Sequence, residues 1–194
     1  MIPETYQAEA IRLYRADPFP TRWTFVENIL EGPWVDSSIF FFGSRWWLFS
    51  SPVEPENEIL ELFHAESIIG PWLRHPMSPL MKGDKRMARS AGLVIVPGMS
   101  PIRFTQNCVP FYGTTVRAFE VSELSTSHYS EKELAQNPIL SAGDQLWNRS
   151  GMHHIDSHLV DNHWFACVDG WRFEPRTSAQ TQSAMSQPQS GLNK

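Results

Sequence analysis

The chain has 194 residues, of which 41% are hydrophobic, so it is long enough for one domain with a sizeable core. Its net charge of −5 gives no basic surface for nucleic acid, and no apolar run is long enough to span a membrane. Because the N-terminus lacks the pattern of a signal peptide, we expect a cytoplasmic protein.

Apolar runs predict strands along most of the chain, after a loose end at residues 1–6. Residues 10–16 alternate apolar and polar side chains, which is typical of a half-buried strand, and residues 23–30 form a shorter one. Residues 35–50 form a tight hairpin around Gly43-Ser44, and its nearly continuous apolar runs predict that both faces are buried. Further strands are expected at residues 59–65, 72–75, 91–96, 102–105, 116–121, 154–160 and 163–168. Helix is restricted to a turn or two at residues 131–136.

The predicted strands recur with a period of about fifty residues. Arg12-Leu13-Tyr14-Arg15-Ala16 matches Glu61-Leu62-Phe63-His64-Ala65, and a weaker third copy begins at Val116. Each copy is followed by a hairpin, and four short strands per repeat predict blades of a β-propeller. The fold class is therefore all-β, a partial propeller of the five-bladed kind with about three blade repeats.

The repeats also predict how the chain is organised. It enters at the third strand of one blade and leaves after the second strand of another. Three repeats are fewer than the four to eight blades of typical propellers, so we expect an incomplete ring that lacks upstream blades. The propeller domain is placed at residues 1–173. Residues 174–194, rich in Ser, Gln, Ala and Thr, are expected to be disordered.

Several short motifs occur in a fixed order along residues 10–172. They are Leu13–Ala16, Val35–Phe40, Arg45–Phe49, Leu62–Ala65, Ala88–Gly92, Gln106–Cys108, Tyr112–Gly113, Gly151–His154 and Val168–Arg172. As a set they resemble the N-terminal propeller domain of plant glucosamine inositolphosphorylceramide transferases. That domain is similar in turn to the five-bladed propellers of furanosidase-type glycoside hydrolases.

The resemblance implies a carbohydrate-related domain. In the hydrolases an Asp at the start of an inner strand serves as general base, and Asp36 stands at the matching place. In the plant enzymes glycosyl transfer is attributed to a separate C-terminal domain, which has no counterpart here. The resemblance therefore implies glycan contact without by itself implying catalysis.

Alignment of the three hairpins by their turns predicts a binding site. It puts Asp36, Arg89-Ser90 and His153-His154 at equivalent strand starts, where inner strands of a propeller meet the central channel. Gln106 and Asn107 follow a second strand and reach the rim. The expected substrate-binding residues, with a glycan or sugar head group as ligand, are Asp36, Arg89, Gln106, Asn107, His153 and His154.

Catalysis by this site would need a second carboxylate. Glycoside hydrolysis uses an acid and a base on either side of the bond, and Asp36 with Asp156 is the candidate catalytic pair. His154, Asp156 and His158 share a strand face but step about 6.5–7 Å apart, too far for one small ion, so we expect no metal and no cofactor. Structural roles remain open, since Asp36 could cap a turn or pair with Arg89, and Asp156 could support His154.

Three functions remain open from the sequence. The first is a glycan-binding module that acts beside a glycosyltransferase-type partner domain or protein. The second is a glycoside hydrolase-like enzyme with Asp36 as general base, and the third is a protein-interaction propeller.

Overall fold

The computed structural model describes residues 1–174 and is almost entirely β, as predicted. Its strands form four antiparallel sheets in chain order. The first two sheets comprise β1 (Ala10–Ala16) with β2 (Trp23–Glu31), then β3 (Trp34–Phe42), β4 (Arg45–Pro52), β5 (Ile59–Ala65), β6 (Leu73–Arg74) and β7 (Met81–Lys82). The last two comprise β8 (Ile102–Asn107), β9 (Thr115–Leu124) and β10 (Tyr129–Glu133), then β11 (Gly151–Val160) with β12 (His163–Trp171).

The only helical segments among residues 1–174 are two short 3₁₀ turns, η1 (Tyr6–Ala8) and η2 (Leu146–Asn148). Within this part of the chain, no helix has the length and apolar character needed to cross a membrane. The tail predicted to be disordered lies, apart from Glu174, outside the described residues.

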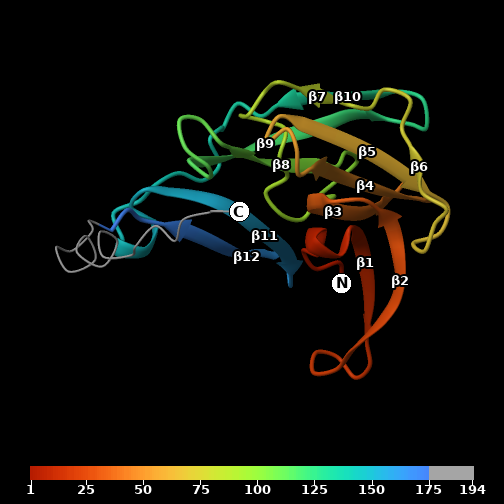
Figure 1. Ribbon diagram of the computed structural model, residues 1–194. Coiled ribbons are helices and arrows are strands. Elements are labelled where there is room, and N and C mark those ends of the chain that lie inside the picture. Colours follow the sequence, from red (N-terminus) through yellow and green to blue (C-terminus); the bar gives the residue numbers. More distant parts are fainter. Residues whose placement is uncertain (175–194) are drawn as a thin grey trace, which may run out of the picture.

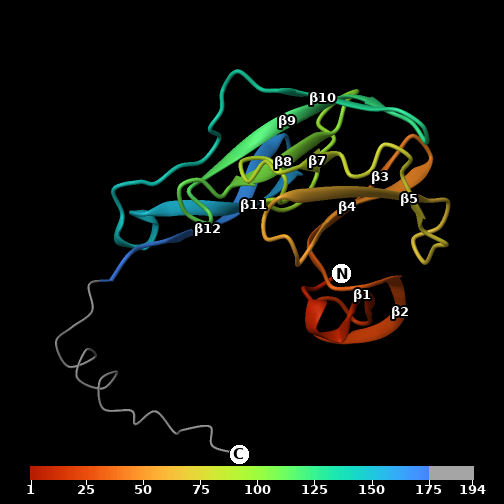
Figure 2. The ribbon, with the colours of Figure 1, turned by 45° about the horizontal axis from the view of Figure 1, so that its top comes forward.

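The two larger sheets lie between the two-stranded ones. Figure 1 shows the β1–β2 ribbon projecting at one end of the molecule and the β11–β12 ribbon at another, and the turned view in Figure 2 keeps this arrangement. In the second sheet the order is β3-β4-β5-β6, and β7 also pairs with β5. The third sheet has the order β10-β9-β8.

Two hairpins have turns that their sequences explain. Gly43 and Ser44 join β3 to β4 with φ of 59° and 63°, the left-handed pair required by the commonest two-residue hairpin turn. Asp161 and Asn162 join β11 to β12 in the same way, with φ of 48° and 63°. The two hairpins therefore have turns of the same type.

Three apolar clusters fill the space between successive sheets. One joins the first sheet to the second through Ile11, Leu13, Leu48 and Phe63. The second lies between the second and third sheets, and the third joins the third sheet to β11 through Ile155. Strand β4 is buried over most of its length, as its apolar run predicts.

Three local predictions were wrong. Residues 91–96 make only isolated bridges, at Gly92 and Ile95, rather than a continuous strand. Residues 131–133 belong to β10, because Glu131 is bound into the sheet by a buried ion pair. The N-terminus is not loose, since the amide of Tyr14 donates to the carbonyl of Met1 at 2.8 Å.

Candidate functional site

Strands from two sheets meet beside the segment that connects β7 to β8. The hydroxyl of Ser38 on β3 donates to the carbonyl of Gly92, and Gly92 forms a parallel bridge with Ile155 on β11. Gly92 has φ of +118°, and a Cβ there would lie 2.1 Å from the Ile155 carbonyl oxygen. Only glycine allows this approach, so the position brings three sequence-distant segments together.

Backbone irregularities precede this meeting point on both flanking strands. The register of β3 against β4 shifts between Val35 and Ser38, and Asp36, inside the shift, has φ of +50°. The register of β11 shifts similarly between Gly151 and His154. Bulges of this kind re-aim side chains and are common beside functional sites.

Asp36 is the centre of a polar cluster from separate segments. Arg89 donates from Nε to Asp36 Oδ2, and Gln106 Nε2 donates to the same oxygen at 2.8 Å. Gln106 Nε2 also lies 2.8 Å from the carbonyl of Ser90, and Arg89 Nη1 donates to Asn57 Oδ1 at 2.9 Å. Arg89 and Asp36 retain only 13% and 23% of their side-chain surface, so the pair is largely shielded from solvent.

One face of the cluster opens on a pocket of about 220 Å³. Asp36 and His154 line it together with Glu4, whose Oε2 accepts a hydrogen bond from the Asp36 amide at 3.0 Å. Trp34 and Ile11 supply an apolar wall. The pocket therefore combines carboxylates with an aromatic ring, the combination that suits a sugar's hydroxyls and its apolar face.

The titratable groups around the pocket have pKa values that their surroundings shift for different reasons. Burial raises the pKa of the Glu4 carboxyl, and the charge of Asp36 adds to the rise. Burial opposes ionisation of Arg89, but the carboxylate of Asp36 outweighs it and raises the pKa of the guanidinium. The ring of Tyr112 lies 5.6 Å from the Arg89 guanidinium, and desolvation raises its pKa to about 12.

Of the six predicted binding residues, Asp36 and His154 line this pocket. Arg89 and Gln106 contact it only through their hydrogen bonds to Asp36. His153, the neighbour of His154, instead faces Tyr112 at a ring-centroid distance of 5.2 Å and lies 3.0 Å from Asp169. Asn107 is used locally, since its Oδ1 accepts from the Val109 amide at 3.1 Å. Neither His153 nor Asn107 is among the residues that line the pocket.

The predicted pairing of Asp36 with Asp156 does not appear as a shared pocket. The residues that line the pocket of Asp36 do not include Asp156. Asp156 Oδ1 lies 3.1 Å from His158 Nε2, so its partner is two residues along β11 and is not His154, the partner considered from sequence. Among residues 1–174 no group of three potential ligands could hold a metal ion.

Sequence reasoning missed three residues of the cluster. Glu4 and Asn57 reach it across 32 residues of chain each, to Asp36 and Arg89 respectively, and no local pattern encodes such contacts. Tyr112 lies inside a recognised motif, Tyr112-Gly113, but nothing in the motif assigns it a role. Asn57 does carry one sequence signal, because Asn shortly after Pro is typical of a turn, and its φ of +63° agrees with that.

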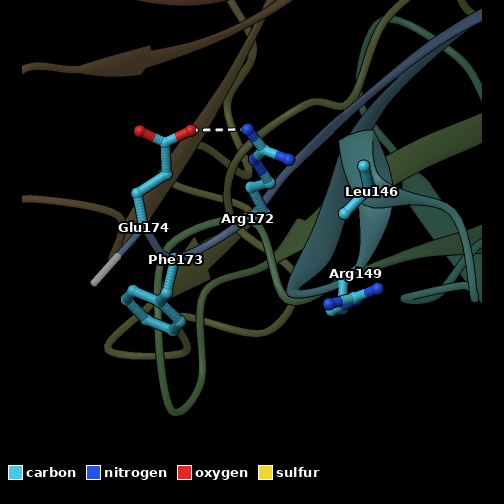
Figure 3. A pocket seen from close by; sticks show the side chains of 5 residues that line it. All are labelled: Leu146, Arg149, Arg172, Phe173 and Glu174. Carbon is cyan, nitrogen blue, oxygen red and sulfur yellow. Dashed lines mark hydrogen bonds and ion pairs between the residues drawn. The ribbon is translucent and has the colours of Figure 1, made fainter.

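Another hollow, of about 330 Å³, lies near the end of the described chain. Figure 3 shows Arg172 turned toward Glu174, with Arg149 set apart beside Leu146. Arg172 Nη2 lies 2.6 Å from Glu174 Oε1, so one of the two guanidinium groups is already paired. None of the predicted site residues lines this hollow.

Comparison with known proteins places the chain in a family. The family model described as "Glucosamine inositolphosphorylceramide transferase 1, N-terminal" matches residues 1–171. The glucosamine inositolphosphorylceramide transferase 1 of Oryza sativa subsp. japonica is 33% identical over 181 positions, which cover 89% of this chain and 24% of the relative. The Arabidopsis thaliana protein of that name is 31% identical over 179 positions, covering 89% and 23%. The chain thus spans about a quarter of the length of these relatives and belongs to the family of the glucosamine inositolphosphorylceramide transferase 1 N-terminal domain.

Proposed function

We propose that the chain is part of a β-propeller whose Asp36 pocket binds a glycan, and that it acts as a binding module beside a glycosyltransferase-type activity. In this proposal the second and third sheets are blades, the β1–β2 sheet is the outer half of a blade, and the β11–β12 sheet is the inner half of another. The close contact among Ser38, Gly92 and Ile155 supports an axis on which inner strands converge.

The observation that carries the proposal is that Arg89 and Gln106 both bond to Asp36, which lines the pocket. They come from β3, the segment before the third sheet and β8, and their atoms make charge-assisted hydrogen bonds. A carboxylate held in this way is preorganised to accept hydrogen bonds from sugar hydroxyls. The family supports the same conclusion, because the relatives' name describes them as glucosamine inositolphosphorylceramide transferases.

Replacement of Asp36 tests the proposal. Asn has nearly the same shape and tolerates the left-handed backbone of this position, so Asp36→Asn should fold. It should weaken binding of the best ligand from a glycan panel that includes glucosamine by roughly 1.5–3 kcal/mol, the worth of hydrogen bonds to a charged group. Calorimetric titration measures the change. Asp84→Asn is the control, since Asp84 pairs with Arg86 and is not among the residues that line the pocket.

The opposite outcome would assign Asp36 a structural role. If Asp36→Asn lowers the melting temperature markedly and leaves glycan affinity unchanged, the carboxylate serves only to hold Arg89 in place.

A hydrolase is the second candidate, and Glu4 is the observation that favours it. Two carboxyl groups face one pocket, and burial raises the pKa of one of them, as a general acid requires. In this case Glu4 would donate a proton to the leaving oxygen while Asp36 took one from the attacking water. Hydrolysis of aryl glycosides that is lost in both Glu4→Gln and Asp36→Asn would establish it, and the absence of turnover would leave the binding module.

A further inference from the structure

The pocket of Asp36 is the first of three hollows that follow one another along residues 4–9. The second hollow, of about 320 Å³, is lined by Arg89, the ion-pair partner of Asp36, and by Tyr6, next to Thr5 of the first. The third, of about 420 Å³, shares Tyr6, Val53 and Glu54 with the second. The second and third hollows therefore adjoin, and the Asp36–Arg89 ion pair joins a residue of the first hollow to one of the second. The three hollows are called here the N-terminal groove.

The wall of this groove is fixed by hydrogen bonds. The Tyr14 amide donates to the Met1 carbonyl at 2.8 Å, and the hydroxyl of Thr5 donates to the Ala10 carbonyl at 2.7 Å. Glu4 is bound to the Asp36 amide. These bonds hold the wall of the groove in place, as expected of a preformed binding site.

The groove has a defined chemistry. Its carboxylates are Glu4, Glu9, Asp36, Glu54 and Glu56, whereas Arg89 is the one cation among the residues that line the three hollows. Tyr6 and Trp34 add aromatic surface, and prolines border the third hollow. Acidic ligands are disfavoured here by like-charge repulsion, while hydroxyl-rich ligands find many acceptors.

The size of the groove suggests a ligand of more than one unit. The first hollow, about 220 Å³, is smaller than the 300–1,000 Å³ that is usual for a ligand site, whereas the three in series lie within that range. We propose, on the basis of the glycan-binding function proposed above, that the ligand is a linear oligosaccharide without acidic groups. One sugar unit lies beside Asp36, and the following units extend past Arg89 toward Glu54.

The test compares ligands of increasing length. Glucose, N-acetylglucosamine, mannose and xylose oligomers of one to four units are titrated calorimetrically, with oligogalacturonides as the acidic series. For the series that binds, the trimer should bind at least about tenfold more tightly than the monomer, since each further unit adds net hydrogen bonds. The oligogalacturonides should bind more weakly than the neutral oligomers of the same length.

Glu54→Gln tests the far part of the groove. Glu54 is exposed and lines the second and third hollows but not the first, so the variant should lose about tenfold in trimer affinity and keep monomer affinity. Glu123→Gln, at an exposed position on β9 outside the groove, should change neither affinity.

Three results would overturn the inference, and they differ in what else they affect. Equal affinity for monomer and trimer, with binding that still depends on Asp36, would show that the ligand does not extend along the groove. The proposed function would then remain intact. Tighter binding of oligogalacturonides would contradict the charge argument alone. Failure of every oligomer to bind would remove both the inference and the proposed function.

Discussion

At the scale of single residues, the site depends on a side chain that joins two segments. Gln106 is 2% exposed, and its Nε2 donates both to Asp36 Oδ2 and to the Ser90 carbonyl. It therefore links β8 to the segment before the third sheet while it holds the carboxylate in position. Loss of the donor to a buried acceptor lowers the free energy of unfolding by about 1–3 kcal/mol.

Gln106→Leu keeps most of the side-chain volume and removes the donor. We expect the free energy of unfolding, measured by urea titration, to fall by about 1–3 kcal/mol, with a further loss of glycan affinity. Gln145→Leu, at an exposed position, should change stability by less than about 0.5 kcal/mol. Equal stabilities of the two variants would show that the Gln106 hydrogen bonds are not needed.

The proximity of residues in the candidate site was predictable where the repeats align. Asp36, Arg89 and His154 occupy equivalent positions in successive hairpins, so the alignment indicated that they converge. For Asp156, strand periodicity gives the face on which the side chain lies but not its partner, which is His158. Glu4 could not be predicted, since its contact exists only once the N-terminal segment packs along β1.

At the scale of elements, a buried ion pair joins the outer strands of the third sheet. Arg103 on β8 and Glu131 on β10 retain 0% and 6% of their side-chain surface, and Arg103 Nη2 lies 2.6 Å from Glu131 Oε1. Tyr129 also donates to Glu131, and Arg103 packs against the rings of Phe49 and Phe119. Removal of one partner would leave an uncompensated buried charge.

Glu131→Gln should therefore lower the free energy of unfolding by about 3–5 kcal/mol at pH 7. Glu133→Gln, which removes a more exposed pair with Arg117, should cost less than about 1 kcal/mol. Urea unfolding of both variants beside the wild type gives the comparison. A cost for Glu131→Gln no larger than that of Glu133→Gln would show that the buried pair does not stabilise the sheet.

The same pair gives a pH dependence. Burial opposes ionisation of Glu131, but the charge and hydrogen bonds of Arg103 outweigh it and lower the pKa of the carboxyl. A lowered pKa in the folded state means stability that is complete above the ordinary Glu value, near 4.3, and lost as the pH falls through the folded value. The difference between wild type and Glu131→Gln should therefore shrink below about pH 4. A constant difference would contradict this assignment.

Elements were predictable where pattern and turn chemistry agree. The strands at residues 10–16 and 59–65 have the predicted bounds, and Gly43-Ser44 forms the expected turn. The segment at residues 91–96 has strand-like residues, but Gly92 at φ of +118° interrupts the ladder to approach β11. At residues 131–133, tertiary pairing with Arg103 decides the conformation in favour of strand.

At the scale of the whole molecule, the repeats account for the order of the sheets. The second sheet has five strands and the third three, with a two-stranded sheet before and after them, and apolar clusters between successive sheets hold them together. The sequence could not predict that one edge of β12 is exposed. Among the described residues β12 pairs only with β11, and its Trp164 and Phe165 are 49% and 61% exposed.

An unpaired apolar edge predicts self-association. Sedimentation velocity should show association that increases with protein concentration, and Phe165→Lys should reduce it, since lysine on an edge strand opposes pairing. Glu123→Lys, at an exposed position on β9, is the control and should leave association unchanged. A wild-type chain that stays monomeric at all concentrations would contradict an open edge at β12.

The central claim is that the Asp36 pocket binds a glycan, and nuclear magnetic resonance tests its location most directly. The indole of Trp34 lines the pocket and the side-chain amide of Gln106 contacts Asp36, so both carry reporting N–H groups. On titration with the best-binding glycan, these two signals should shift most, while the indoles of Trp147 and Trp164 stay unchanged. Largest shifts at Trp147 or Trp164, with Trp34 and Gln106 unaffected, would contradict the account.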